Sequence, residues 1–98
     1  MIYILLCKDK PGHLQTRLDN RPLHVEHLKG LEAAGTLKFA GPFLGADGNP
    51  TGSMVAVEAA DEADARALAE SDPYAKAGLF ESVDIRPWTW VFCKPDGI

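Results

Sequence analysis

The sequence predicts an α+β domain whose elements follow the order β-α-β-β-α-β. Three observations support this prediction. The chain has 98 residues, enough for one domain with one core. Four short segments are rich in strand-forming residues, and two longer segments have helical periodicity or a helix-forming composition. The sequence contains no repeat, low-complexity tract or linker, so residues 1–98 are expected to form a single domain.

The first strand is expected at residues 2–7, "IYILLC". It is apolar on both parities, with Ile2 and Ile4 on one face and Tyr3 and Leu5 on the other. A strand with one face in water alternates apolar and polar residues. This strand is therefore expected to be covered on both sides.

The first helix is expected at residues 18–35, with Asp19 or Asn20 as its cap and Pro22 in its first turn. Gly35 is the expected C-terminal stop. At about 100° per residue, one face collects an apolar stripe with two histidines. Its members are Leu23, His24, His27, Leu28, Leu31 and Ala34. His27 lies nearer the middle of this stripe than His24, so it is expected to be the more buried of the two.

The remaining elements follow in order. Asp61 is the expected cap of an alanine-rich second helix, and Pro87 suggests an edge position or a bulge in the last strand. In the second strand, Leu37 and Phe39 are expected on one face. The expected ranges are a strand at 36–43, a glycine-rich connection at 44–52, a strand at 53–60, a helix at 61–71, a short helical piece at 72–78 and a strand at 81–93.

Right-handed crossovers fold this order into a four-stranded antiparallel sheet with both helices on one face, the ferredoxin-like arrangement. The helices leave the other face without cover. The first strand is nevertheless apolar on that side, and Trp88, Trp90 and Phe92 form a stripe in the last strand. A second copy of the sheet is the simplest cover, so a homodimer is expected.

Composition excludes several classes of function. The net charge is −4, and no Lys/Arg cluster appears, so neither nucleic-acid binding nor attraction to an anionic membrane is expected. Cys7 and Cys93 fit neither a disulfide framework nor a zinc motif, which favours free thiols and a cytoplasmic location. The apolar start is too short for a signal peptide or a membrane span.

Asp72 and the two histidines are the candidates for chemistry. Asp72 precedes a proline, so it fits an ordinary helix cap as well as a catalytic carboxylate. Histidine is the residue type most often used as a general base near neutral pH, but periodicity does not choose between His24 and His27. A metal shared by the two histidines lacks further ligands at a supporting spacing, so no metal and no cofactor are expected. No nucleophile motif or phosphate loop is present.

Three motifs together resemble the YCII-related (YciI-like) family. They are "R-x-x-H" in the first helix, "A-G-P" in the second strand, and "D-P-Y-x-x-A-G-L-F" before the last strand. The resemblance covers nearly the whole chain in the right order. It implies a dimeric α+β barrel, the superfamily that also holds muconolactone isomerases and small cofactor-free monooxygenases. It also implies a His-Asp dyad, which maps onto His24, three residues after Arg21, and onto Asp72 of "DPY". One departure is Val25, where leucine commonly follows the histidine.

The leading hypothesis is thus a small cofactor-independent enzyme that uses His24 as general base or acid and Asp72 as its orienting partner. Suitable reactions are isomerisation, elimination or proton abstraction on a small organic molecule. Because some relatives act as dehydrochlorinases of hydroxylated aromatics, the resemblance suggests such a substrate. Arg21, Ser53 and Tyr74 are the candidate substrate-binding residues. The alternatives are a non-catalytic small-ligand-binding or regulatory dimeric module and a structural dimer with a vestigial site.

Overall fold

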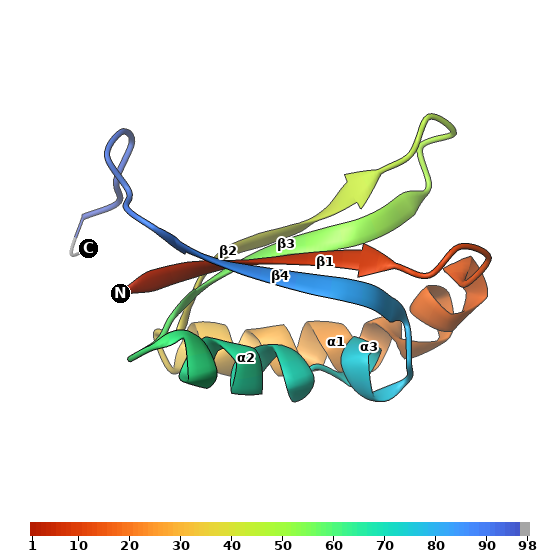
Figure 1. Cartoon of the computed structure of the whole chain (residues 1–98), viewed down its shortest axis with the longest axis horizontal. Coiled ribbons are helices and arrows are strands. Elements are labelled where there is room, and N and C mark those ends of the chain that lie inside the picture. Colours follow the sequence, from red (N-terminus) through yellow and green to blue (C-terminus); the bar gives the residue numbers. More distant parts are fainter. Residues whose placement is uncertain (97–98) are drawn as a thin grey trace.

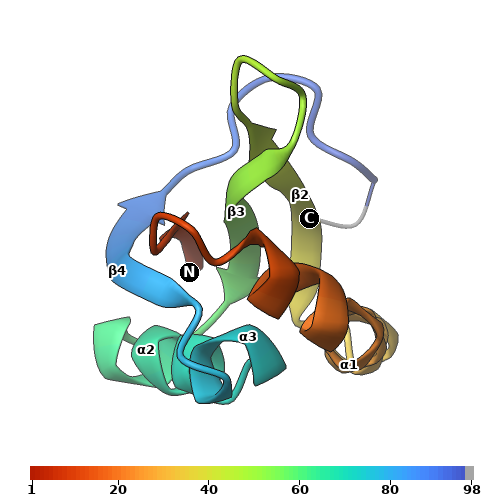
Figure 2. The same ribbon diagram turned by 90° about the vertical axis from the view of Figure 1, so that its right-hand side faces the viewer.

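The computed structural model describes residues 1–96 and has the predicted ferredoxin-like fold. A four-stranded antiparallel sheet, in the order β2-β3-β1-β4, carries all the helices on one face (Figure 1). On that face α1 lies beside β2, and α2 lies beside β4 (Figure 2). The elements are β1 (Ile2–Asp9), α1 (Leu14–Ala33), β2 (Leu37–Leu44), β3 (Pro50–Glu58), α2 (Glu62–Glu70), α3 (Pro73–Lys76) and β4 (Phe80–Trp88).

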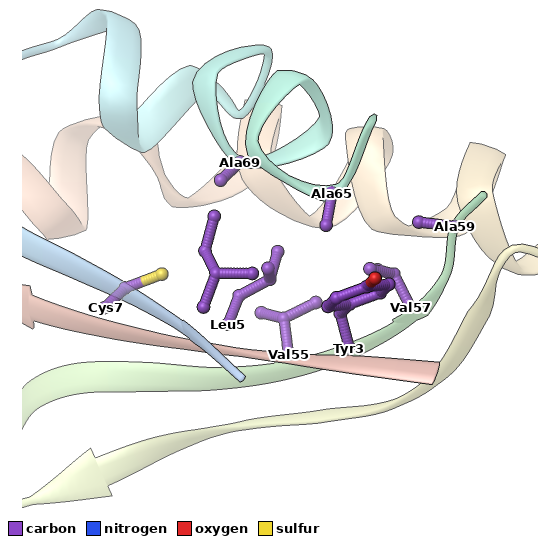
Figure 3. Close-up of a cluster of buried hydrophobic side chains, with 9 residues drawn as sticks. Tyr3, Leu5, Cys7, Val55, Val57, Ala59, Ala65 and Ala69 are labelled. Carbon is purple, nitrogen blue, oxygen red and sulfur yellow. The ribbon is translucent and has the colours of Figure 1, made fainter. Parts of the chain in front are cut away.

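The central strand β1 is buried on both faces, as its composition predicts. It pairs with β3 on one side and with β4 on the other. Tyr3, Leu5 and Cys7 point toward the helices and join the main core (Figure 3). Ile2 and Ile4 belong to a second cluster on the opposite face. Helix α2 closes the main core over β1 with two buried small side chains, Ala65 and Ala69, and with the partly buried Leu68.

Helix α1 begins earlier than the sequence predicts. It starts at Leu14, and neither Asp19 nor Asn20 caps it, because both lie inside the helix. Pro22 therefore occupies an interior position and not the first turn. A proline there removes one backbone hydrogen bond. The 20-residue helix continues through it, and Pro22 itself is exposed.

The C-terminal end of α1 matches the prediction. Gly35 has φ of +78°, a conformation that glycine adopts without strain. The amide of Gly35 donates to the carbonyl of Glu32 at 3.0 Å, and that of Thr36 donates to Leu31 at 2.9 Å. This is the Schellman pattern, which satisfies the last carbonyls of a helix.

The second helix, α2, is capped as predicted. The Asp61 carboxylate accepts from the backbone N–H of Asp64 at 2.8 Å. This bond satisfies one of the first four amides of α2, which have no partner inside the helix.

Two predictions about β2 and the loop that follows it are wrong in detail. Leu37 and Phe39 do not share a face: Leu37 pairs with Val57 and Phe39 with Ala56, so the register shifts between them. Leu37 therefore packs against the main core, and Phe39 packs against the second cluster. The loop between β2 and β3 is also shorter than predicted, at residues 45–49.

The last strand ends at Trp88, five residues before the predicted end. Beyond it the chain turns on the side of the sheet away from the helices (Figure 1). The Trp90 indole donates to the carbonyl of Phe92 at 2.7 Å, which stabilises this turn. As predicted from Pro87, β4 is an edge strand.

Three aromatic side chains, Phe39, Trp88 and Trp90, form a group on the helix-free face of the sheet. Phe39 contacts Trp88 and Trp90 edge to face, with ring centroids 5.6 and 5.2 Å apart. Trp90 packs against Ile2, Ile4 and Ala56, whereas Phe92, expected in the same stripe, is exposed. No helix among residues 1–96 is long and apolar enough to span a bilayer.

We predict that a second copy of the chain covers this helix-free face. Sedimentation at micromolar concentration should then give about twice the 10.6 kDa chain mass. Trp90→Glu should weaken the dimer by placing a charge on the covered face, with circular dichroism as the check that the fold persists. A wild-type monomer would contradict the barrel arrangement. An unchanged dimer in Trp90→Glu would show that the interface lies on another surface.

We predict very different reactivity for the two cysteines, which are both free, as expected. Cys7 is buried, and burial together with the nearby Asp72 charge raises its pKa to about 12, although Arg17 opposes the shift. At pH 8 the reactive thiolate of Cys7 is then only about 10⁻⁴ of the population, while Cys93 is exposed. Thiol titration of the native protein should show one fast group and a second only after unfolding. Two equally fast thiols would contradict the burial of Cys7.

Candidate active site

A cavity of about 390 Å³ opens between α1, strands β2 and β3, and α3. Its volume falls in the range of small-molecule sites, and like them it has an apolar wall with few polar groups. The cavity is lined by Arg17, Leu18, Arg21, His24, Val25 and Leu28 of α1, by Ala40, Gly41, Pro42 and Leu44 of β2, by Pro50, Ser53 and Val55 of β3, and by Tyr74 of α3.

His24 and Asp72 form a buried pair at this cavity. His24 Nδ1 lies 2.9 Å from both carboxylate oxygens of Asp72, although 48 residues separate the two along the chain. His24 is 8% exposed and Asp72 6%. The pair forms because α1 packs against α3, and Asp72 is the N-cap of α3. The structure thus brings together the two residues that the family resemblance singled out.

Asp72 is also the helix cap that its sequence context predicts. Its Oδ1 accepts from the backbone N–H of Tyr74 at 2.9 Å, and Pro73 follows at the first helical position. The cap and the histidine contact do not compete, because a carboxylate has about four acceptor positions. One side chain therefore serves both roles.

The contact with Asp72 determines which ring nitrogen of His24 is available. A carboxylate only accepts hydrogen bonds, so in the neutral imidazole Nδ1 carries the ring proton and Nε2 keeps its lone pair. Nε2 has no hydrogen-bond partner among residues 1–96, and no buried side-chain nitrogen or oxygen there lacks one. Nε2 is therefore accessible. Since His24 lines the cavity, a molecule in it can meet this nitrogen.

Tyr74 orders the middle of the site. Its ring stacks on His24 with centroids 3.9 Å apart and 15° between the planes. Phe80 contacts the same ring edge to face at 6.1 Å. Tyr74 is only 1% exposed, and burial raises the pKa of its hydroxyl despite the opposing charge of Arg17. Its ring is thus a fixed, uncharged platform.

Arg17 is a site residue that the sequence analysis missed. It is 4% exposed and donates from Nε and Nη2 to the two oxygens of Asp9 at 2.7 and 2.9 Å. Nη2 also donates to Ser53 Oγ at 3.0 Å, and the guanidinium carbon lies 4.6 Å from the centre of the Tyr74 ring. Burial disfavours the charged guanidinium, but the bonds and charge of Asp9 outweigh this effect and raise the pKa of Arg17.

A sequence signal for Arg17 did exist. It lies four residues before Arg21 and seven before His24, so the three share one face of a helix. Placing the helix start at residue 18 left Arg17 outside the element. A start at Leu14 would have placed it on the face that meets the sheet.

The other predicted site residues divide into two groups. Ser53 is buried against Arg17, and Tyr74 lines the cavity, whereas Arg21 is exposed at its rim. His27 does not line the cavity and is less buried than His24, which contradicts the prediction from the apolar stripe. The reason is the contact with α3, which covers His24 and was not visible in the helix pattern. Among residues 1–96, no group of three or more potential metal ligands is present.

Comparison with known proteins identifies the family. The model of the YCII-related domain matches residues 1–89. The chain belongs to the YCII-related family. Protein YciI of Escherichia coli O6:H1 is 38% identical to it over 98 residues, covering 94% of this chain and all of YciI. An uncharacterized protein of Haemophilus influenzae is 36% identical over the same coverage.

Two further relatives in this comparison have names that refer to aromatic compounds. The protein called derivative of benzaldehyde biosynthesis cluster protein C, from Emericella nidulans, is 40% identical over 72 residues, which are 66% of this chain and 74% of that protein. The solved structure of 5-chloro-2-hydroxyhydroquinone dehydrochlorinase (TftG) from Burkholderia phenoliruptrix has a TM-score of 0.83 and 36% identity. It covers 91% of this YCII-related chain and 94% of its own, and it is a complex with 2,5-dihydroxybenzoquinone.

The two roles of Asp72 can be separated by Asp72→Asn. Asparagine caps helices about as well as aspartate, so the free energy of unfolding should fall by less than about 1 kcal/mol. The amide can, however, present an N–H to His24 Nδ1, which would move the ring proton to Nε2. Long-range ¹H–¹⁵N NMR of the imidazoles should show this change of tautomer in His24. The His27 ring, in the same spectrum, is the internal control. An unchanged His24 tautomer would leave Asp72 as a helix cap alone.

Proposed function

We propose that this protein is a small cofactor-independent enzyme that performs general acid–base chemistry on a small organic substrate. The observation that supports the proposal is the arrangement of His24. One ring nitrogen is held by a buried aspartate, and the other is accessible at a cavity of ligand size. A candidate general base has to reach the proton that it removes, and Nε2 meets this geometric requirement.

The division of work within the pair follows from this geometry. The lone pair of Nε2 takes a proton from the substrate, and the ring becomes an imidazolium. Asp72, bonded to Nδ1, stabilises that positive charge and keeps the ring in its tautomer. In an elimination, the electron pair of the broken bond expels a leaving group. In an isomerisation, Nε2–H returns the proton to another atom of the substrate.

The proposed substrate is a hydroxylated aromatic or quinone-like molecule. A cavity of about 390 Å³ with an apolar wall accommodates one substituted six-membered ring. The similarity to TftG, a dehydrochlorinase solved in complex with 2,5-dihydroxybenzoquinone, supports the same class. By this similarity, the chemistry would resemble that of a lyase or an isomerase.

The alternative is a module that binds the same kind of ligand without turnover. The double use of Asp72 favours it, since capping α3 by itself is a structural reason to retain this aspartate. Both functions need the cavity, so ligand binding does not separate them. Turnover does.

The test is a screen of the purified protein against chlorinated hydroxyhydroquinones, hydroxybenzoquinones and lactones, followed by absorbance and chloride release. For any substrate found, His24→Asn should reduce kcat by about 10²–10⁴-fold, because its amide can still donate to Asp72 but offers no base. The matched control is His27→Gln, one turn along the same helix and outside the cavity lining, which should leave kcat unchanged. Undiminished turnover in His24→Asn would overturn the proposal. Tight binding without turnover would favour the binding module.

A further inference from the structure

Three large apolar side chains are exposed at the mouth of the cavity, which consists of its solvent-exposed lining residues. Leu18 and Val25 of α1 and Leu44 of β2 line the cavity, and their exposed fractions are 45, 37 and 63%. Single exposed leucines are common on protein surfaces and need no explanation. A group of them around one opening does need one, because apolar area that remains in water marks a binding surface.

The geometry of α1 separates these apolar residues from the polar ones. Arg17 and His24 lie seven residues apart, so they share one face of the helix, and both are buried. Leu18 and Val25 have the same spacing but lie about 100° further around the helix, and both are exposed. The cavity therefore has a buried polar floor and an exposed apolar mouth.

Strand β2 completes the apolar mouth. Ala40 and Pro42 line the cavity beside Leu44 and are also exposed. None of these three side chains forms hydrogen bonds. Among the described residues that line the mouth, Arg21 is the one that carries a charge, and a long arginine side chain extends its guanidinium into water. A ligand group at the mouth therefore meets mainly hydrocarbon.

The cavity is larger than one ring requires. Its volume is about 390 Å³, whereas a closed apolar cavity of about 150 Å³ already binds benzene. A six-membered ring that contacts Nε2 of His24 lies at the polar floor. Such a ring leaves space between itself and the mouth.

We infer that the mouth of the cavity binds an alkyl substituent of the substrate ring. This inference rests on the proposed function and specifies its substrate class, a hydroxylated aromatic or quinone-like ring that carries a short alkyl chain. The ring lies beside His24, and the chain lies between Leu18 and Val25 on one side and Leu44 on the other. Seven residues of helix span about 10 Å, which is enough for a chain of several carbons.

The predicted dimer leaves this mouth open to a ligand. The second copy is expected on the helix-free face of the sheet, whereas the cavity lies on the face that carries the helices (Figure 1). The apolar residues of the mouth are therefore available to a small molecule in the dimer as well.

The test measures the contribution of the chain alone. The probes are 2,5-dihydroxybenzoquinone and its 3-butyl derivative, which have the same ring and hydroxyls and differ by four carbons. Full burial of one methylene group contributes about fourfold in affinity, so half-burial at an open mouth contributes about twofold. Calorimetric titration of the wild type should therefore show the butyl compound binding at least about tenfold more tightly.

Two variants of the mouth and one matched control locate the chain. In Leu18→Ala and in Leu44→Ala the preference for the butyl compound should fall to about threefold or less, while the affinity for the unsubstituted ring changes by less than about twofold. Leu23→Ala should keep the full preference, because Leu23 is 60% exposed on the same helix but does not line the cavity. Thermal unfolding checks that each variant is folded. Should one of the two mouth variants misfold, the other decides.

An undiminished preference in a folded Leu18→Ala or Leu44→Ala would overturn the inference. So would an equal loss in Leu23→Ala, which would place the chain on the outer surface of α1. Dissociation of the dimer in Leu44→Ala, measured by sedimentation, would assign the mouth to a subunit contact and overturn it too.

The wild type separates this inference from the proposed function. Equal binding of the two probes would overturn the inference while leaving the proposed substrate ring intact. Binding of neither probe would contradict the proposed substrate class and the inference together.

Discussion

The site depends on the hydrogen bonds that the buried Asp72 carboxylate accepts. It accepts from the first turn of α3 and from the imidazole of α1, so it joins two helices through one buried side chain. A buried carboxylate without partners is costly, and here both oxygens have donors. Losing either hydrogen bond would leave the buried negative charge of Asp72 with fewer donors to stabilise it.

The short helix α3 is needed to carry Tyr74 to its position. It has only four residues, too few for a stable helix by itself, so the cap and the proline at its start matter more than they would in a long helix. Once α3 is in place, the Tyr74 ring lies against His24, and the Arg17 guanidinium lies over that ring. The capping hydrogen bond of α3 therefore helps to set the positions of Tyr74, His24 and Arg17 in the cavity wall.

The sheet contributes the second half of the site. Asp9, at the end of β1, and Ser53, in β3, hold the Arg17 guanidinium by hydrogen bonds from the sheet. Helix α1 supplies Arg17 and His24 from one of its faces. Antiparallel pairing of β1 with β3 places Ser53 opposite Cys7, two residues from Asp9. Two neighbouring strands and one helix thus orient the polar groups, and these groups are held by contacts within the protein before any ligand arrives.

Much of the fold could be predicted from local patterns alone. The order of the elements along the chain, the apolar composition of β1 on both faces, the cap at Asp61, the stop at Gly35 and the cap at Asp72 all depend on residues within a few positions of each other. The family motifs added the pairing of His24 with Asp72, which no periodicity in one chain shows. Such features are accessible from sequence because backbone hydrogen bonds and capping contacts act over two to five residues.

Tertiary structure decided what depends on distant neighbours. Packing of α3 made His24 more buried than His27, although the helix pattern favours the opposite order. Pairing of Arg17 with Asp9 and Ser53 turned a residue outside the predicted helix into a buried member of the site. The register shift beyond Leu37 and the turn held by Trp90 likewise depend on β3 and on the aromatic group of the helix-free face. Burial is a property of the whole packed chain, so the sequence determined the elements and their order, and only their packing determined which polar side chains meet at the cavity.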